Sequence, residues 1–528
     1  MQAIRSFFGH FIGNAHSVKD FRIQMRGNKA LVLWSLYLVL LVLFAMFTYG
    51  GVASQMRAGM SAAEMQNRLQ SFYNTLMYLL QTAIILIAPV LASASIVADD
   101  ERGSIDLVLM APKSSTYYFA GLVMSGMRQL IFLLALSIPV ASLGVIMGGA
   151  TWTDVLRSFT IFLFQGLFYM CLGVPVAVST RKMVPTVIGS YVAIAIGSGI
   201  LAIMNAIMAP AMLSGMMGGP ALTTPTMPLF SVLTPYWHIA ANAPLTTVTP
   251  TLTIPTWAAT ILMSTLGVAI CMLGSASQMS RAGTPAVVAT RIVGLIIALL
   301  AGMLISQIFS TMFGFAGSSS APSSAVYMIT TALGGFILAG IIMLIITTNV
   351  VPYAFRDGEK FFPNGMFSLK DAFMGRPAGG MPYSLLTFAC LFGPASYYLF
   401  KGIFLSTYSA LTAFSVMFWF LCASYMHFGI FRFISPWNGS VKTARRIGVL
   451  LIVGINVGMA MLLAILDLAI KNKNSLSLLN PLHPYAELPE GVIVKGIVLA
   501  ILGGFLVKRS EERRIKHPLM KIKGQETA

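Results

Sequence analysis

Long apolar runs alternate with short polar connectors along almost the whole chain. Several runs exceed 18 residues with few charges, and a helix of that length spans the hydrocarbon core of a bilayer. Membrane barrels show shorter segments of alternating hydrophobicity instead. We therefore predict an all-α polytopic membrane helical bundle of twelve transmembrane helices, at residues 30–52, 72–98, 116–148, 155–178, 184–208, 257–275, 288–313, 324–350, 383–402, 406–429, 447–467 and 490–507.

Composition agrees with a membrane protein, and the basic residues predict its orientation. Of the 528 residues 57% are hydrophobic and only 9% are charged, against about 25% charged in soluble domains. With the N-terminus inside, 26 of the 34 Lys and Arg residues fall in cytoplasmic segments, as the positive-inside rule requires. The basic excess thus reflects topology rather than nucleic-acid binding. We expect cytoplasmic termini and a multi-pass protein of the cell membrane, such as the bacterial inner membrane.

The predicted spans fall into two sets of six. We divide the chain into an N-terminal segment, two six-helix halves and a basic cytoplasmic tail, at residues 1–28, 29–283, 284–507 and 508–528. The two halves have equal span counts and the same orientation, which suggests a parallel duplication. The segment 1–28 is either an amphipathic stretch lying on the membrane surface or an ordinary basic flank that sets topology.

The outer segment 209–256 has an unusual composition, with eight prolines and several methionines. It is too apolar for a free linker and too rich in proline for a straight span. We expect short or re-entrant helices that cap the outer mouth of the bundle. Non-helical backbone at that depth must be buried in protein or line a cavity.

A search for catalytic and cofactor motifs finds none. The chain has no GxxxxGK[ST] phosphate loop, no HExxH and no GxSxG in a strand–turn–helix setting. The four cysteines all lie in apolar runs without CxxC spacing, so we interpret them as packing thiols. We predict no enzyme, no metal and no cofactor in this chain. The clearest intramembrane charge is Arg128, which could face a polar cavity, contact an anionic headgroup, form a structural ion pair or snorkel; we favour the last two.

The connector 99–115 is the most unusual polar stretch, because it holds four of the sixteen acidic residues. Ser104 is a good N-cap, Asp106 would lie in the first turn, and Pro112 would end the helix. We predict a helix of about two turns, roughly 104–111, parallel to the membrane. Such a short helix needs packing against a partner or against its own bundle. The alternative is an ordered turn without a partner.

The run Glu101-Arg102-Gly103-Ser104-Ile105-Asp106-Leu107, with Pro112 after it, resembles the loop between the second and third helices of ABC-2-type transporter permeases. The glycine comes one position earlier than in the family pattern, and Ser104 stands for the commoner threonine. The stretch KDFRIQMRGNKALVL is similar to the family's N-terminal interfacial helix, and the six-span layout of residues 1–283 fits as well. The loop 351–382, which holds the equivalent position in the second half, does not resemble it.

By this resemblance the connector is a coupling element that docks on a separate cytoplasmic ATP-binding subunit of an ABC transporter. The residues implied are Asp99, Asp100, Glu101, Arg102, Gly103, Ser104, Asp106, Leu107 and Pro112. ATP would be bound by the partner subunit. Family permeases work as pairs of six-span units, so either one chain supplies both units or a second permease copy joins it. Membrane lipid would surround the bundle.

The resemblance implies the permease subunit of an ATP-driven exporter. Two other classes stay open. A stand-alone secondary transporter or channel would need intramembrane coupling charges, which are scarce in this sequence. A membrane scaffold or a lipid enzyme is the third class, and the enzyme would need a catalytic cluster.

Overall fold

A computed structural model describes the helical parts of the chain. It describes residues 14–26, 28–55, 61–103, 115–199, 226–236, 239, 245–249, 252–278, 285–314, isolated positions between 372 and 394, and residues 410–434, 447, 450, 451 and 489–516. The chain divides into two compact units, Met1–Val293 and Gly294–Ala528. The boundary between them lies within one long helix.

The described residues form a helical membrane protein, as the hydropathy pattern predicts. Seven of their helices are long and apolar enough to cross a membrane, and Met183–Gly199 is a shorter apolar helix. The total of twelve spans and the side of the termini stay predictions, because the spans at 324–350 and most of those at 383–402 and 447–467 lie outside the described residues. The finding that stands is a multi-pass helical protein.

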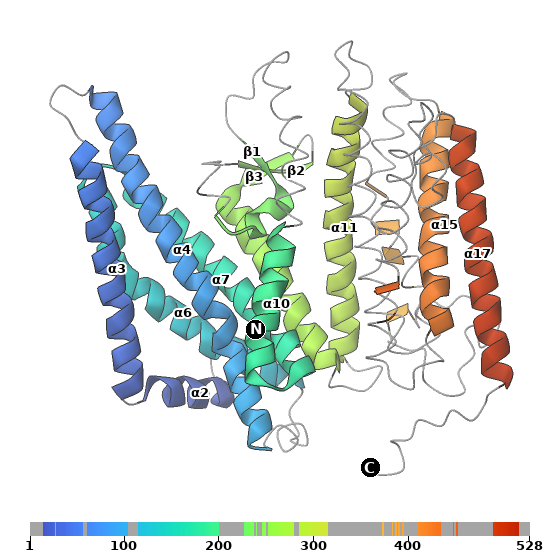
Figure 1. Ribbon diagram of the computed structural model, residues 1–528, viewed down its shortest axis with the longest axis horizontal. Helices are drawn as coiled ribbons and strands as arrows, with labels where there is room; N and C mark the ends of the chain where they lie inside the picture. Colours follow the sequence, from blue (N-terminus) through green and yellow to red (C-terminus); the bar gives the residue numbers. More distant parts are fainter. Residues whose placement is uncertain are drawn as a thin grey trace, which may run out of the picture. The chain divides into compact units, whose positions relative to one another are not determined.

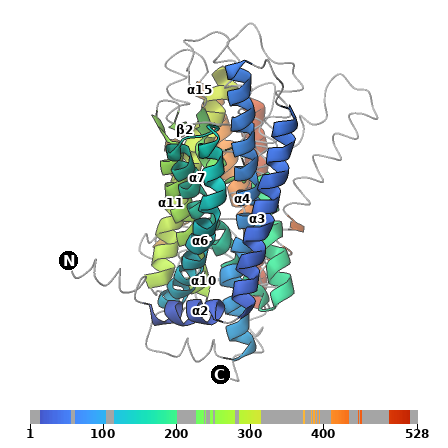
Figure 2. The same cartoon turned by 90° about the vertical axis from the view of Figure 1, so that its left-hand side faces the viewer.

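Unit 1 contains one short helix followed by a bundle of long ones (Figure 1). Its helices are α2 (Ala15–Met25), α3 (Asn28–Gln55), α4 (Ala62–Glu101), α6 (Ser115–Ile146), α7 (Trp152–Thr180), Met183–Gly199 and α10 (Thr256–Gln278), and α11 (Pro285–Gly314) crosses the unit boundary. Helix α2 lies crosswise to α3 and α4 in both views (Figures 1 and 2). The basic flank of the first span is therefore a separate helix.

The helix ends have local causes in the sequence. Both α4 and α7 begin with a capping box, in which Ser61 pairs with Glu64 and Thr151 pairs with Asp154. Each box satisfies backbone N–H groups that the helix leaves free, and it places a carboxylate at the positive end of the helix dipole. Between α6 and α7, Gly148 adopts φ +81, a left-handed conformation that glycine allows without strain.

The core of unit 1 lies where α4, α6 and α7 meet. Its fully buried side chains include Phe72 and Leu76 of α4, Phe119 of α6 and Phe162 of α7. Helix α3 differs, since most of its large apolar side chains are exposed, with Phe47 79% accessible. A helix exposed in this way can rest only against lipid or another apolar surface.

The described part of the outer segment contains a small sheet and one short 3₁₀ helix, whereas residues 209–225 of this segment lie outside the described residues. Its described elements are β1 (Thr226–Pro228), the 3₁₀ helix η1 (Leu229–Leu233), β2 (Leu245–Thr249) and β3 (Leu252–Pro255). The strand order is β1-β2-β3, with β1 parallel and β3 antiparallel to β2. The β-branched residues of the LTTVT and LTIP stretches favour strands, and proline is tolerated on edge strands such as β1 and β3.

Within unit 2 the described helices α15 (Ala410–Ile434) and α17 (Pro489–Lys516) pack closely along their length. Their backbones approach at Gly429 and Gly503. A Cβ atom on Gly429 would lie 2.8 Å from the carbonyl oxygen of Gly503. Small residues at such crossings let transmembrane helices come together without side chains between them.

Candidate functional site

The acidic residues of the connector belong mainly to the end of α4. Asp99, Asp100 and Glu101 form its last helical residues, where we expected a loop leading into a short helix. Arg102 caps the helix, and Gly103 follows with φ +65 and donates its N–H to the carbonyl of Asp100. Carboxylates at the C-terminal end of a helix are opposed by its dipole. They therefore need compensating partners from elsewhere in the fold.

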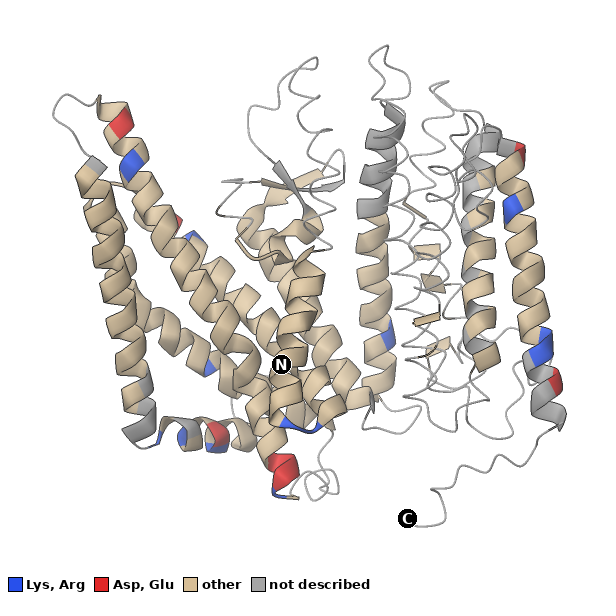
Figure 3. Cartoon of the chain, in the orientation of Figure 1, with Lys and Arg blue, Asp and Glu red and all other residues tan. Residues whose placement is uncertain are grey.

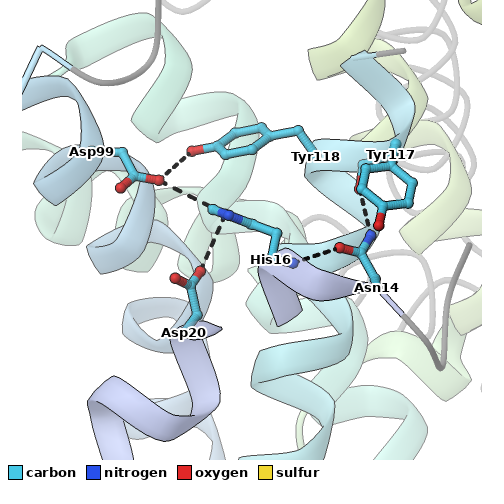
Figure 4. Close-up of polar contacts among 6 residues, drawn as sticks. All are labelled: Asn14, His16, Asp20, Asp99, Tyr117 and Tyr118. Atoms are coloured by element: carbon cyan, nitrogen blue, oxygen red, sulfur yellow. Dashed lines mark hydrogen bonds and ion pairs between the residues drawn. The ribbon is translucent and has the colours of Figure 1, made fainter. Parts of the chain in front are cut away.

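Asp99 and Asp100 find such partners. Asp99 is only 5% exposed. Its carboxylate oxygen Oδ2 accepts a hydrogen bond of 3.0 Å from the hydroxyl of Tyr118 in α6 (Figure 4). The guanidinium of Arg181, just after α7, lies 3.6 Å from Asp100 Oδ1. The end of α4 is thus tied to the start of α6 and to the end of α7.

Helix α2 is fixed to the same place by its N-cap. The side-chain oxygen of Asn14 accepts from the backbone N–H of His16 at 3.0 Å, and its amide nitrogen donates to the carbonyl of Tyr117 at 2.8 Å. Gly121 makes this fit possible, since a Cβ there would come within 2.8 Å of Asn14 Oδ1. The start of α2 therefore sits directly on the first turns of α6.

His16 completes a cluster that we call the α2 junction: Asn14, His16, Asp20, Asp99, Tyr117 and Tyr118 (Figure 4). His16 Nε2 lies 3.3 Å from Asp20 Oδ2 in α2 and 3.8 Å from Asp99 Oδ2 in α4. The imidazole also lies against the ring of Tyr118, with centroids 4.7 Å apart. Charged residues of α2 and of the α4 end gather at this one end of unit 1 (Figure 3).

The sequence alone did not single out His16 or Asp20. The six histidines are scattered along the sequence, and Asp99, which lies close to His16 in the fold, is 83 positions away from it. The available signal was the spacing of His16 and Asp20, four positions apart, which places both on one face of a helix.

Arg128 lies near the same junction. Its guanidinium carbon is 6.0 Å from the centroid of the Phe21 ring in α2, a cation–π distance. The intramembrane charge picked out from the sequence thus adds a contact between α6 and α2. Of the residues predicted for the coupling element, Ser104, Asp106, Leu107 and Pro112 lie outside the described residues, as does the loop 351–382 apart from residues 372 and 373.

A second polar feature crosses the middle of the bundle. Gln81 of α4 donates to Gln165 of α7 at 2.7 Å, and Gln165 donates to the backbone carbonyl of Val232 in η1. Gln81 and Gln165 are each only 1% exposed. Tyr169 of α7 donates to the next carbonyl, that of Leu233, at 2.9 Å.

These bonds show how deep the outer segment enters. Gln165 is in the middle of α7, about 20 Å along the helix from its first residue. The η1 backbone therefore reaches the interior of the bundle, where carbonyl groups have no water to bond. Gln165 and Tyr169 supply the donors that this non-helical backbone needs. In the described part of the outer segment, a 3₁₀ turn is thus bonded to buried side chains of α7.

The described residues hold no group of three or more His, Cys, Asp or Glu side chains that could bind a metal ion. The four cysteines are free thiols. Neither a family model, nor a curated protein, nor a solved structure matches the chain. We call the contacts among Gln81, Gln165 and the Val232 carbonyl the glutamine link. Within the described residues, the α2 junction and the glutamine link are the features from which we argue a function.

Proposed function

We propose that the chain is the transmembrane permease subunit of an ATP-driven ABC exporter, with ATP hydrolysed by a separate cytoplasmic subunit. The observation that carries the proposal is the α2 junction together with the family-like connector beside it. The connector joins the ends of two long helices, α4 and α6, and its acidic start is fixed in a network of partners. A partner that pulls on the connector would move both helices.

The lengths of these helices support such a role. Helix α4 has 40 residues and α6 has 32, which correspond to about 60 Å and 48 Å of helix. Both exceed the roughly 30 Å of the hydrocarbon core. A force applied at the connector would thus be transmitted across the membrane by continuous helices. The absence of a phosphate-binding loop in the sequence fits an ATPase on another chain.

The first test of this proposal is purification in a mild detergent from the native membrane. We expect an ABC ATPase to accompany the chain in stoichiometric amount. ATPase activity of the complex should respond to lipid reconstitution. Recovery of the chain without any phosphate-loop ATPase, under conditions that keep other membrane complexes intact, would contradict the proposal.

A charge-reversal variant tests the connector itself. Replacing Asp100, Glu101 and Asp106 by lysine should lower ATPase stimulation and transport about tenfold or more, because losing one close interfacial charge pair typically costs 1.5 kcal/mol or more. The variant loses the Asp100–Arg181 ion pair, but the Arg181 side chain is largely exposed, so this loss should cost only about 0–1 kcal/mol. The variant should still reach the membrane, since Asp99 and its contacts are kept.

The matched control reverses three acidic residues of the tail, Glu511, Glu512 and Glu526, to lysine. It makes the same change in net charge on the side predicted to be cytoplasmic, and we expect near-normal activity. Equal activity of the two variants would remove the coupling role from the connector.

A further inference from the structure

The α2 junction places one imidazole between two buried carboxylates. Asp20 is 7% exposed and Asp99 is 5% exposed, and each has an oxygen within 4 Å of the same nitrogen of His16. We propose that His16, Asp20 and Asp99 form a proton-binding site, and that a proton bound there fastens α2 to the end of α4.

Electrostatics give the direction of the effect. The carboxylate oxygens of Asp20 and Asp99 lie 3.3 Å and 3.8 Å from the same nitrogen, so they are at most about 7 Å apart. When the imidazole is neutral, the two carboxylates repel each other in this partly dehydrated site. When it is protonated, one positive charge lies between them and attracts both. Histidine is the side chain that changes charge between pH 5 and pH 8. The attachment of α2 should therefore strengthen as the pH falls through that range.

Two other cations act on Asp20, exposed Lys19 of α2 and Arg102 at the end of α4, and they do not outweigh its burial. Asp100 pairs with Arg181, which directly follows α7. From α6, Tyr118 donates its hydroxyl to Asp99 and so keeps that carboxylate in place.

The behaviour of Asp20 points the same way. Burial raises the pKa of Asp20; His16 lowers it, Asp99 raises it, and Lys19 and Arg102 lower it. A raised pKa means that the charged form of this carboxyl is disfavoured in the folded protein, so its unfavourable effect is present at neutral pH and disappears as the pH falls. A proton on His16 offsets this unfavourable effect, because it places a positive charge beside both carboxylates.

The hydrogen-bond geometry leaves room for a change of state. Neither Nε2 of His16 nor Oδ2 of Asp20 has a hydrogen-bond partner, although the two atoms lie 3.3 Å apart. The pair is close enough for an ion pair once the imidazole is protonated, and Nε2 then carries the proton that a hydrogen bond to Oδ2 needs. The junction thus has two arrangements, loose and fastened, that differ by one proton.

The consequence for transport rests on the proposed function, whereas proton binding does not. Fastening α2 would restrain the end of α4, from which the connector begins. In a working exporter, the low-pH state should couple to the ATPase differently from the high-pH state.

Hydrogen exchange of the full-length protein in nanodiscs tests proton binding directly. The measured quantity is the protection factor of the α2 amides, which removes the intrinsic effect of pH on exchange. We expect a roughly fivefold rise from pH 8.0 to pH 5.5, the ratio expected for a modest ion-pair energy. His16→Gln should abolish the rise. Asp20→Asn should reduce it and should raise the protection already at pH 8.0, because one of the two repelling carboxylates is gone.

Two further variants keep the test sharp. His16→Lys places a lasting positive charge in the site and should give high protection at both pH values, so it covers the case in which His16→Gln loses its fold. His517→Gln, in the tail, removes a histidine elsewhere and should leave the rise unchanged. Persistence of the rise in His16→Gln, or its absence from the wild type, would overturn the inference. Failure to find an ATPase partner would leave these exchange results unaffected.

Discussion

Replacing Gly503 by leucine is expected to separate α15 from α17 and to cost about 3 kcal/mol or more, the upper range for overpacking. A Cβ atom at this position would lie 2.9 Å from the Tyr425 ring and 3.0 Å from backbone atoms of Met426. Backbone atoms cannot move aside as a flexible side chain can. A thermal-stability assay by size exclusion in detergent should show a large loss of the monodisperse species.

The neighbouring Gly504 provides the matched control. Among the described residues, a Cβ atom there would meet the Tyr425 hydroxyl alone, at 3.9 Å, so Gly504→Leu should retain most of the wild-type stability. Gly429→Leu should behave like Gly503→Leu, since it fills the other side of the same crossing. If Gly503→Leu and Gly504→Leu melt together, the close approach of the two helices is not needed for stability.

Replacing Gln165 by methionine is expected to release the outer segment from the interior of unit 1. Methionine keeps the length and approximate volume of the side chain but removes its polar atoms. The Val232 carbonyl would then lose the Gln165 donor, and the Gln81 amide would lose its acceptor. Each unsatisfied group costs several kcal/mol in a dehydrated membrane interior, or roughly 1–3 kcal/mol by protein mutational data. We expect lower thermal stability and faster proteolysis of the outer segment in sealed, right-side-out vesicles.

Gln66→Met is the control for this prediction. Gln66 also donates its side-chain amide to a backbone carbonyl, that of Gly148, but this hydrogen bond is exposed. Water can replace it, so the loss should be small. Similar proteolysis of the Gln165→Met protein and the wild type would contradict the role of the glutamine link in holding η1 inside the bundle.

Hydropathy predicted the parts of this fold that depend on local sequence. The apolar runs of α3, α4, α6 and α7 are long enough to be recognised as membrane spans from the sequence alone. The capping residues Ser61 and Thr151 are likewise local signals. Hydropathy could not predict the end of α4. The helix continues through Asp99 and Asp100, although aspartate disfavours a helix C-terminus, and the distant partners Tyr118 and Arg181 compensate the two charges.

The contacts that join different helices at the candidate site are distant in the sequence, unlike the His16–Asp20 pair within α2. Asn14 and Tyr117 are 103 positions apart in the sequence, and Gln165 and Val232 are 67 apart. No periodicity or motif in a single sequence connects such pairs. The small sheet of the outer segment was not predicted for a related reason, since the many prolines excluded a straight span but did not indicate which strands pair.

Helix α4 also offers a way to observe the molecule from its far end. It continues for 40 residues from Ala62 to Glu101, so a tilt of ten degrees about its midpoint would displace each end by about 5 Å, given a length near 60 Å. Met65, close to its first residue, is 46% exposed. A spin label or fluorophore at that position would report, from the opposite side of the bilayer, what happens at the α2 junction without touching it.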